Sequence, residues 1–186
     1  MEFDLEQRRF HRDASLLAES NEKWLARLAP HVTGGSDPDF GNRVEHAMAG
    51  LVAASVAPID GAAALLDKLA ATTTHVAMAT NDSERSAASQ VDQLGWSHLI
   101  TTVVGYDSGF GPKPEPGMIL ALTERFAVAA TETLMVGDTW ADAEAAAAAG
   151  VPFCLLDPDG TVRRQLRPDY VVKSLDELEA LLFDQR

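Results

Sequence analysis

Features that would point to an exported or membrane protein are scarce in this sequence. The chain has one cysteine, Cys154, so it cannot form an internal disulfide bond and suits a reducing compartment. No apolar run approaches the ~20 residues needed to span a membrane. The N-terminal segment Met1–Glu6 has neither the basic nor the apolar stretch of a signal peptide. The sequence therefore predicts a cytoplasmic protein without a membrane span.

Positive charge is also scarce. The chain has 15 Lys and Arg residues against 28 Asp and Glu residues, a formal net charge of −13. A field of this sign disfavours nucleic acid and anionic membrane surfaces as partners. An anionic ligand would therefore need local cations or helix N-termini to overcome the overall charge. Apolar residues make up 46% of 186 positions, enough for a buried core, and the length suits one domain or one domain that carries a small helical insert.

Residues 1–57 are predicted to be mostly helical and to form a cap-like region. Apolar residues recur at helical spacing from Leu16 to Leu28 and again from Asn42 to Ser55. Pro30 ends the first helix, and a loop containing glycine and proline separates it from the second. No segment of this region shows the strong alternation of a strand.

Beyond Pro58–Gly61, helices alternate with short apolar strands. The pattern predicts strands at 75–80, 99–104, 133–137, 151–156 and 170–172, and helices at 62–71, 83–94, 117–126, 142–149 and 175–183. Such alternation predicts right-handed βαβ crossovers and a parallel sheet covered by helices on both faces. The predicted fold is thus α/β, with a three-layer, Rossmann-like core at 58–186 and a partial helical cap at 1–57. In such sheets, ligands bind at the carboxyl ends of the strands.

The first predicted strand of this core ends at Thr80, and Asn81 and Asp82 lead into the next helix. A hydroxyl, an amide and the free N–H groups of a helix start suit a phosphate oxygen. The alternative is a helix cap, in which Asn81 or Asp82 caps the helix and Glu84 closes a capping box.

The second strand is followed by Gly105–Pro116, a loop rich in glycine and proline. Lys113 lies between two prolines, which restrict its backbone and can aim its ammonium group into a cleft. A lysine fixed in this way can bind phosphate as a point charge. The alternative is a solvated lysine on a surface turn.

The third strand ends at Asp138, and Asp142 follows on the same face of the next helix. Two carboxylates at this position could hold Mg²⁺, which prefers oxygen ligands and retains several waters. Gly137 permits a close approach to the strand end. The alternative is that both acids simply complement the helix dipole.

Together, these strand ends resemble the haloacid dehalogenase superfamily of phosphotransferases and phosphatases. Residues 76–81 resemble its second motif, and Gly111–Pro114 resembles its third, with Pro112 in place of the more usual glycine. Gly137–Gly150 resembles its fourth motif. The resemblance covers roughly residues 58–160 and, within the superfamily, is strongest to phosphoglycolate phosphatases.

The resemblance implies a covalent mechanism, in which an aspartate at the end of the family's first strand attacks phosphorus and forms an aspartyl-phosphate. A second aspartate two residues later acts as general acid and then as base. It further implies that Thr80 and Asn81 bind phosphoryl oxygens and that Lys113 neutralises charge on nucleophile and phosphate. Asp138 would bind Mg²⁺ and Asp142 would support the metal site. The implied ligand is a small phosphorylated metabolite.

The family's first motif, an apolar strand followed by Asp-x-Asp-Gly-Thr, has no acceptable counterpart. The nearest string, Phe3–Arg8, places Asp4 after too few residues for a central strand, and Glu6 stands where the second aspartate belongs. We therefore expect Asp4 to be a surface acid, and the chain to lack the first strand and its nucleophile. A misassigned start codon, truncation or evolutionary loss would each produce this arrangement, and residues 1–57 resemble the later part of a cap.

Two functions are compatible with these observations. The first is a Mg²⁺-dependent phosphatase acting on a small phosphate monoester such as phosphoglycolate. The second is an inactive homologue that binds phosphate or a partner. The later motifs favour the first, and the missing first motif favours the second for this polypeptide.

Overall fold

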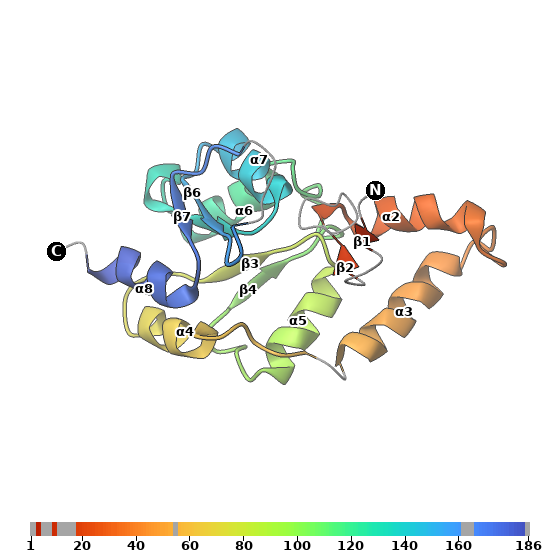
Figure 1. Cartoon of the computed structure of the whole chain (residues 1–186), viewed down its shortest axis with the longest axis horizontal. Coiled ribbons are helices and arrows are strands. Elements are labelled where there is room, and N and C mark those ends of the chain that lie inside the picture. The colour runs from red at the N-terminus through yellow and green to blue at the C-terminus, as the bar shows by residue number, and fades with distance from the viewer. Residues whose placement is uncertain (1–2, 5–8, 11–17, 54–55, 161–165, 185–186) are drawn as a thin grey trace.

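The computed structural model describes residues 3–4, 9–10, 18–53, 56–160 and 166–184 (Figure 1). The strands are β1 (Phe3–Asp4), β2 (Arg9–Phe10), β3 (Ala77–Ala79), β4 (Thr102–Val104), β5 (Met135–Gly137), β6 (Phe153–Leu156) and β7 (Tyr170–Val172). The helices are α2 (Asn21–Leu28), α3 (Phe40–Ala53), α4 (Ala62–Ala70), α5 (Glu84–Gln93), α6 (Gly117–Phe126), α7 (Trp140–Ala149) and α8 (Leu175–Phe183), with 3₁₀ turns η1 (Ala29–His31) and η2 (Ala130–Glu132). Within the described residues, no helix is both long enough and apolar enough to cross a membrane.

The strands after residue 58 pair in parallel, which confirms the predicted α/β class. β3 pairs with β4, with Ala77 opposite Thr102, and β5, β6 and β7 form a second sheet in that order. The arrangement differs from the predicted single sheet, because no hydrogen-bonded pair of described strands joins β3 to β5. The parallel strands are therefore divided into two groups at this point.

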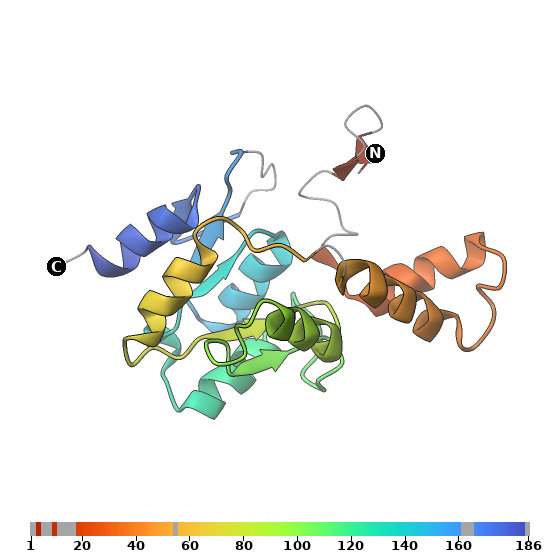
Figure 2. The same cartoon turned by 90° about the horizontal axis from the view of Figure 1, so that it is seen from below.

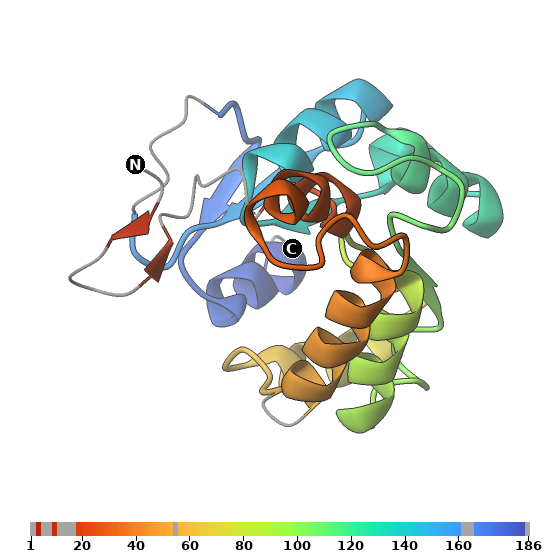
Figure 3. The same ribbon diagram turned by 90° about the vertical axis from the view of Figure 1, so that its right-hand side faces the viewer.

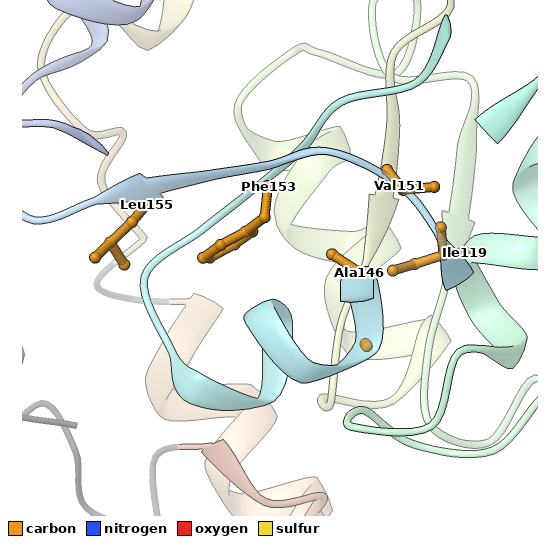
Figure 4. Packing of buried hydrophobic residues seen from close by; sticks show 6 residues of the cluster. Ile119, Ala146, Val151, Phe153 and Leu155 are labelled. Atoms are coloured by element: carbon orange, nitrogen blue, oxygen red, sulfur yellow. The ribbon is translucent and has the colours of Figure 1, made fainter. Parts of the chain in front are cut away.

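β6 is the centre of the core because it is buried on both faces. Its side chains alternate between the two faces, as expected for a strand. Phe153 and Leu155 pack with buried residues of α6 and α7, whereas Cys154 and Leu156 pack with buried residues of α4 and α8. Figure 4 shows the first of these clusters. Helices thus cover both faces of the β5–β6–β7 sheet, giving three layers.

Several predicted strands are shorter in the structure. The predicted strand at 99–104 narrows to β4, because the backbone N–H groups of Leu99 and Ile100 donate to the carbonyl of Trp96 in a turn. Conversely, α7 begins before the predicted Asp142, because Thr139 caps the helix. α6, β7 and α8 have the predicted bounds.

The N-terminal helical region contains α2 and α3, which project to one side of the parallel strands (Figures 1 and 2). α2 begins at Asn21 rather than at the predicted Leu16, because the extended backbone of Ser20 precedes it; residues 16 and 17 lie outside the described residues. α3 begins at Phe40, earlier than predicted, and packs beside α5 (Figure 3). The short antiparallel pair of β1 and β2 was not predicted, since two-residue strands carry no periodicity. The division at residues 57 and 58 stays a prediction.

The packing on β6 predicts a large stability loss on truncation of Phe153. The side chain is 3% exposed, so Phe153→Ala should leave a cavity and cost about 3–5 kcal/mol. Phe110 is 46% exposed, and Phe110→Ala should cost less than about 1 kcal/mol. Urea unfolding of both variants measures the difference. Equal losses would contradict the assignment of β6 to the core.

Candidate functional site

The candidate site lies at the carboxyl ends of β3 and β5, where the Lys113 side chain joins them. Its Nζ donates to the backbone carbonyl of Ala79, at 2.6 Å, and to Oδ1 of Asp142, at 2.6 Å. Both side chains are buried, with 10% of Lys113 and 6% of Asp142 exposed. The alternative of a solvated surface lysine is therefore wrong. The lysine belongs to the loop before α6, so three separate segments meet at one ammonium group.

The hydrogen bond to Ala79 lies on the edge of β3 that faces away from β4. The Thr80 N–H donates to Val104 of β4, and successive residues of a strand direct their backbone groups to opposite edges. The carbonyl of Ala79 therefore belongs to the opposite edge, where Lys113 supplies its hydrogen bond. The ammonium thus lies beside an edge of β3 that pairs with no other described strand.

Both carboxylate oxygens of Asp142 are engaged. Oδ1 accepts from Lys113, and Oδ2 accepts from the backbone N–H and the hydroxyl of Thr139, at 3.0 and 2.6 Å. Thr139 in turn caps α7 by accepting from the Asp142 N–H, at 3.3 Å. The dipole alternative is thus partly right, because Asp142 lies in the first turn of α7 and completes its capping box. The cap at Thr139 was not predicted from the sequence, although Thr-x-x-Asp before a helix is a capping signature.

Gly137 is required by this arrangement. A Cβ atom at this position would lie 2.5 Å from Cγ of Asp142, which is closer than non-bonded carbons approach. A glycine at the end of β5 therefore lets the buried carboxylate pack directly on the strand. The close approach predicted for Gly137 is confirmed.

Asp138, the next residue, is exposed at the end of β5. It offers a hard oxygen donor of the kind Mg²⁺ prefers, and Mg²⁺ commonly uses only one or two carboxylates beside water and phosphate oxygens. Asp142 fits a metal less well, because Lys113 and Thr139 occupy its oxygens. The described residues contain no group of three or more His, Cys, Asp or Glu side chains arranged around a metal site. Metal binding by Asp138 and Asp142 stays a prediction.

Thr80 and Asn81 differ in what they offer a ligand. The Thr80 hydroxyl oxygen accepts from the Asp82 N–H, at 3.1 Å, and a hydroxyl that accepts can still donate its proton. The Asn81 carboxamide instead bonds the protein itself: it accepts from the Lys113 N–H and donates to the carbonyls of Lys113 and Ala18. Phosphate binding by either residue stays a prediction, and the Asn81 side chain acts on Lys113 in the structure.

The start of α5 carries a different cap from the one predicted. Ser83, rather than Asn81 or Asp82, is the capping residue, and its hydroxyl accepts from the Ser86 N–H. Asp82 accepts from the Ser83 N–H, and Asp107 accepts from the Glu84 N–H, both at 2.8 Å. Carboxylates thus already occupy the helix start, so an anion is better served at Lys113 and Thr80 than at these N–H groups.

Polar contacts join the N-terminal helices to these loops. Asn21 of α2 donates to Asp82 at 3.0 Å, and Tyr106, in the loop after β4, donates to Glu45 of α3 at 2.7 Å. Burial, then the hydrogen bond to Glu45 and nearby acidic charge, raise the pKa of the Tyr106 phenol well above its usual range. The helical region is thus bonded to the loops of two strand ends.

Asp4, the nearest sequence match to the missing nucleophile, lies in β1. Its backbone pairs antiparallel with Arg9 of β2, so Asp4 is not on either parallel sheet. This agrees with the expectation that Asp4 is not the nucleophile. The side chain of Asp4 is not among the parts of the chain that the structure describes.

The two parallel sheets, their helical layers and the polar residues at the strand ends define a Rossmann-like α/β protein with its site at the carboxyl edge. The chain belongs to the haloacid dehalogenase-like hydrolases, whose family model matches residues 16–156. The resemblance drawn from the sequence motifs is confirmed.

Relatives and solved structures agree with this family. The chain is 41% identical over 106 residues to phosphoglycolate phosphatase of Rhodospirillum rubrum, covering 57% of this chain and 43% of the relative. It is 34% identical over 118 residues to phosphoglycolate phosphatase of Xylella fastidiosa, covering 63% and 50%. The chain thus spans about half the length of these relatives. The structure of CbbY from Rhodobacter sphaeroides in complex with phosphate has the same fold, with a TM-score of 0.77 at 19% identity over 95% of this chain and 80% of that one.

The buried ion pair predicts a large effect of Lys113 on stability. Lys113→Met leaves the Asp142 carboxylate buried without its cation, which should cost about 3–5 kcal/mol. Asp142→Asn in the same background should restore part of this loss. Lys68→Met removes the exposed pair with Glu179 and should cost less than about 1 kcal/mol. Urea unfolding measures all of these variants, and a Lys113→Met loss no larger than that of Lys68→Met would contradict the burial.

The contact between Tyr106 and Glu45 predicts a pH dependence. A raised pKa in the folded state means that the neutral phenol stabilises the fold below the ordinary tyrosine pKa of about 10, and that this contribution is lost as the pH rises through the folded-state pKa. Tyr106→Phe should remove a late component from the tyrosinate absorbance titration. Glu45→Gln should lower the pKa of Tyr106 only in part, because burial is the larger cause. A late component that persists in Tyr106→Phe would refute this assignment.

Proposed function

We propose that this chain forms the cap-like region and much of the core of a Mg²⁺-dependent phosphatase that acts on a small phosphate monoester such as phosphoglycolate. The observation that carries the proposal is the Lys113 ammonium, which donates to Ala79 and Asp142 beside the open edge of β3. An ammonium group has three donors, so a third N–H is available for a phosphoryl oxygen. The Thr80 hydroxyl, at the end of the same strand, is a second donor. The phosphoglycolate phosphatases among its relatives support the substrate class.

Charge supports the involvement of a metal ion. Asp142 already offsets the charge of Lys113, so the pair is close to neutral, and the chain as a whole carries −13. Holding a phosphate dianion there requires further positive charge. Asp138 would hold Mg²⁺, with the other positions taken by water and phosphate oxygens. When bound, Mg²⁺ would offset negative charge on the phosphoryl group and orient it.

The nucleophile would be an aspartate supplied from outside this 186-residue chain, on a strand that lies between β3 and β5. The division of the parallel strands at this point supports that location, as does the β3 edge that has no described strand beside it. A carboxylate oxygen would form a bond to phosphorus while the bond from phosphorus to the ester oxygen breaks, and a general acid would protonate the departing alcohol. Water would then hydrolyse the aspartyl-phosphate, releasing inorganic phosphate and regenerating the carboxylate. Lys113 would stabilise the negative charge in both steps.

The second candidate is an inactive homologue that binds phosphate or a partner. The observation that favours it is the position of Asp4, which pairs antiparallel in β1 and not within either parallel sheet. The two candidates share the same ligand site and differ in whether a nucleophile is supplied.

Hydrolysis of p-nitrophenyl phosphate and phosphoglycolate with Mg²⁺ separates these candidates. We expect the 186-residue chain to show no turnover above background. A chain extended through the codons before Met1, where the reading frame encodes Asp-x-Asp-Gly-Thr, should be active and should lose activity when Mg²⁺ is removed. In that chain, Lys113→Ala should lower kcat about 10²–10³-fold, whereas Asp4→Asn should have no effect.

Three outcomes would each contradict one part of this proposal: the activity, the missing nucleophile or the site. A stop codon directly upstream of Met1, together with phosphate binding but no turnover, would favour the inactive homologue. Turnover by the 186-residue chain that is abolished by Asp4→Asn would make Asp4 the nucleophile. Undiminished turnover in both Lys113→Ala and Asp138→Asn would refute the proposed site.

A further inference from the structure

The Asn81 side chain makes two hydrogen bonds to the backbone of Lys113. Its Oδ1 accepts from the Lys113 N–H at 2.8 Å, and its Nδ2 donates to the Lys113 carbonyl at 2.8 Å. The second hydrogen of Nδ2 bonds the carbonyl of Ala18 at 2.6 Å. An amide NH₂ group has two donors, so both are used. One carboxamide therefore satisfies both backbone groups of a residue that is distant in sequence.

Lys113 needs such support because its own neighbours cannot provide it. Pro112 and Pro114 lack a backbone N–H, so Lys113 carries the only backbone donor of the three residues. The segment also lies in the loop between β4 and α6, without a helical or strand ladder to hold it. The side chain of Lys113 is nevertheless buried and directed at two acceptors. Within the loop, the Glu115 N–H donates to the Pro112 carbonyl, whereas among the described residues the hydrogen bonds of the Lys113 backbone come from Asn81, outside the loop.

Asn81 is well placed to be that anchor. It directly follows Thr80, at the end of β3, whose Ala79 carbonyl accepts from the Lys113 ammonium. The backbone and the ammonium group of Lys113 are therefore both hydrogen-bonded to residues at the same strand end. The third bond, to Ala18, ties this support to a buried residue at the start of the helical region.

We propose that Asn81 is the positioning residue of Lys113: it fixes the backbone of the lysine so that the ammonium stays at the strand end. That this ammonium meets a phosphoryl group rests on the proposed function; that Asn81 holds it there does not. Asn81 acts through Lys113 and is not itself required to touch the ligand.

Competitive amine labelling with acetic anhydride, read by mass spectrometry, tests this without any assay of activity. The lysines of the chain are Lys23, Lys68, Lys113 and Lys173, and Lys113 is the buried member of this set. Lys113 should therefore label slowest in the wild-type chain, and the exposed lysines serve as internal references. Asn81→Ala should raise Lys113 labelling about tenfold relative to them, the factor expected for losing hydrogen bonds to a buried group. Unchanged Lys113 labelling in a folded Asn81→Ala chain would overturn the proposal.

Control variants separate positioning from general loosening. Asn42→Ala removes an asparagine whose side chain bonds only Asp39 among its described contacts, and it should leave Lys113 labelling unchanged. Phe153→Ala destabilises the core away from the site, and it should raise Lys113 labelling much less than Asn81→Ala. An equal rise in Phe153→Ala would also overturn the proposal. Where Asn81→Ala does not fold, Asn81→Asp is used: it keeps the acceptor for the Lys113 N–H but turns an oxygen toward two carbonyls, and it too should raise labelling.

Inorganic phosphate with Mg²⁺ distinguishes this inference from the proposed function. Phosphate should slow Lys113 labelling in the wild-type chain if the ammonium meets a phosphoryl group. Absence of that protection, together with the expected effect of Asn81→Ala, would refute phosphate binding at Lys113 in this chain and leave the positioning role of Asn81 established.

Discussion

The buried pair of Lys113 and Asp142 is the interaction on which the candidate site depends. It joins the loop before α6 to the start of α7, and the same ammonium also holds the end of β3 through the Ala79 carbonyl. Taking two charges out of water is costly, and the cost is recovered only where other hydrogen bonds satisfy the remaining atoms. Thr139 and Ala79 supply those bonds. Gly137 makes the pair possible by leaving room for the carboxylate against β5.

This pair also bears on how a strongly acidic chain would carry the proposed site for an anion. Asp142 cancels most of the field of Lys113, so the lysine contributes directed N–H groups more than net attraction. In a low-dielectric setting, fixed donors of this kind stabilise developing negative charge without having to reorganise. In the proposed phosphatase, the net attraction would then come from Mg²⁺, which the exposed carboxylate of Asp138 would help to hold. In this proposal, Lys113 would donate to the anion, Asp142 holds Lys113 in place, and Asp138 would bind the cation.

Local patterns in the sequence were sufficient to predict the α/β class, most helices and the positions of Lys113 and Asp142 after successive strands. They failed where a long-range contact decides the outcome. The hydrogen bonds of Asn81 to Lys113 could not be predicted from the residues around Asn81, since its partners, Ala18 and Lys113, are distant in sequence. The division between β3 and β5 concerns strand pairing across the chain, which periodicity does not encode. By contrast, the cap at Thr139 follows from a local sequence pattern and could have been predicted.

The start of α5 bears on why the proposed ligand site lies beside Lys113 and not at this helix. Helix N-termini attract anions, but here Asp82 and Asp107 already accept from the first N–H groups. Asp82 also accepts from Asn21 of α2, so this strand end holds the helical region in place. A ligand anion at α5 would have to displace carboxylates that are bonded to several partners. At Lys113 it would meet an ammonium group that makes two hydrogen bonds among the described residues. The segment after β3 therefore bonds the helical region through Asp82, and the loop before α6 carries the Lys113 ammonium group.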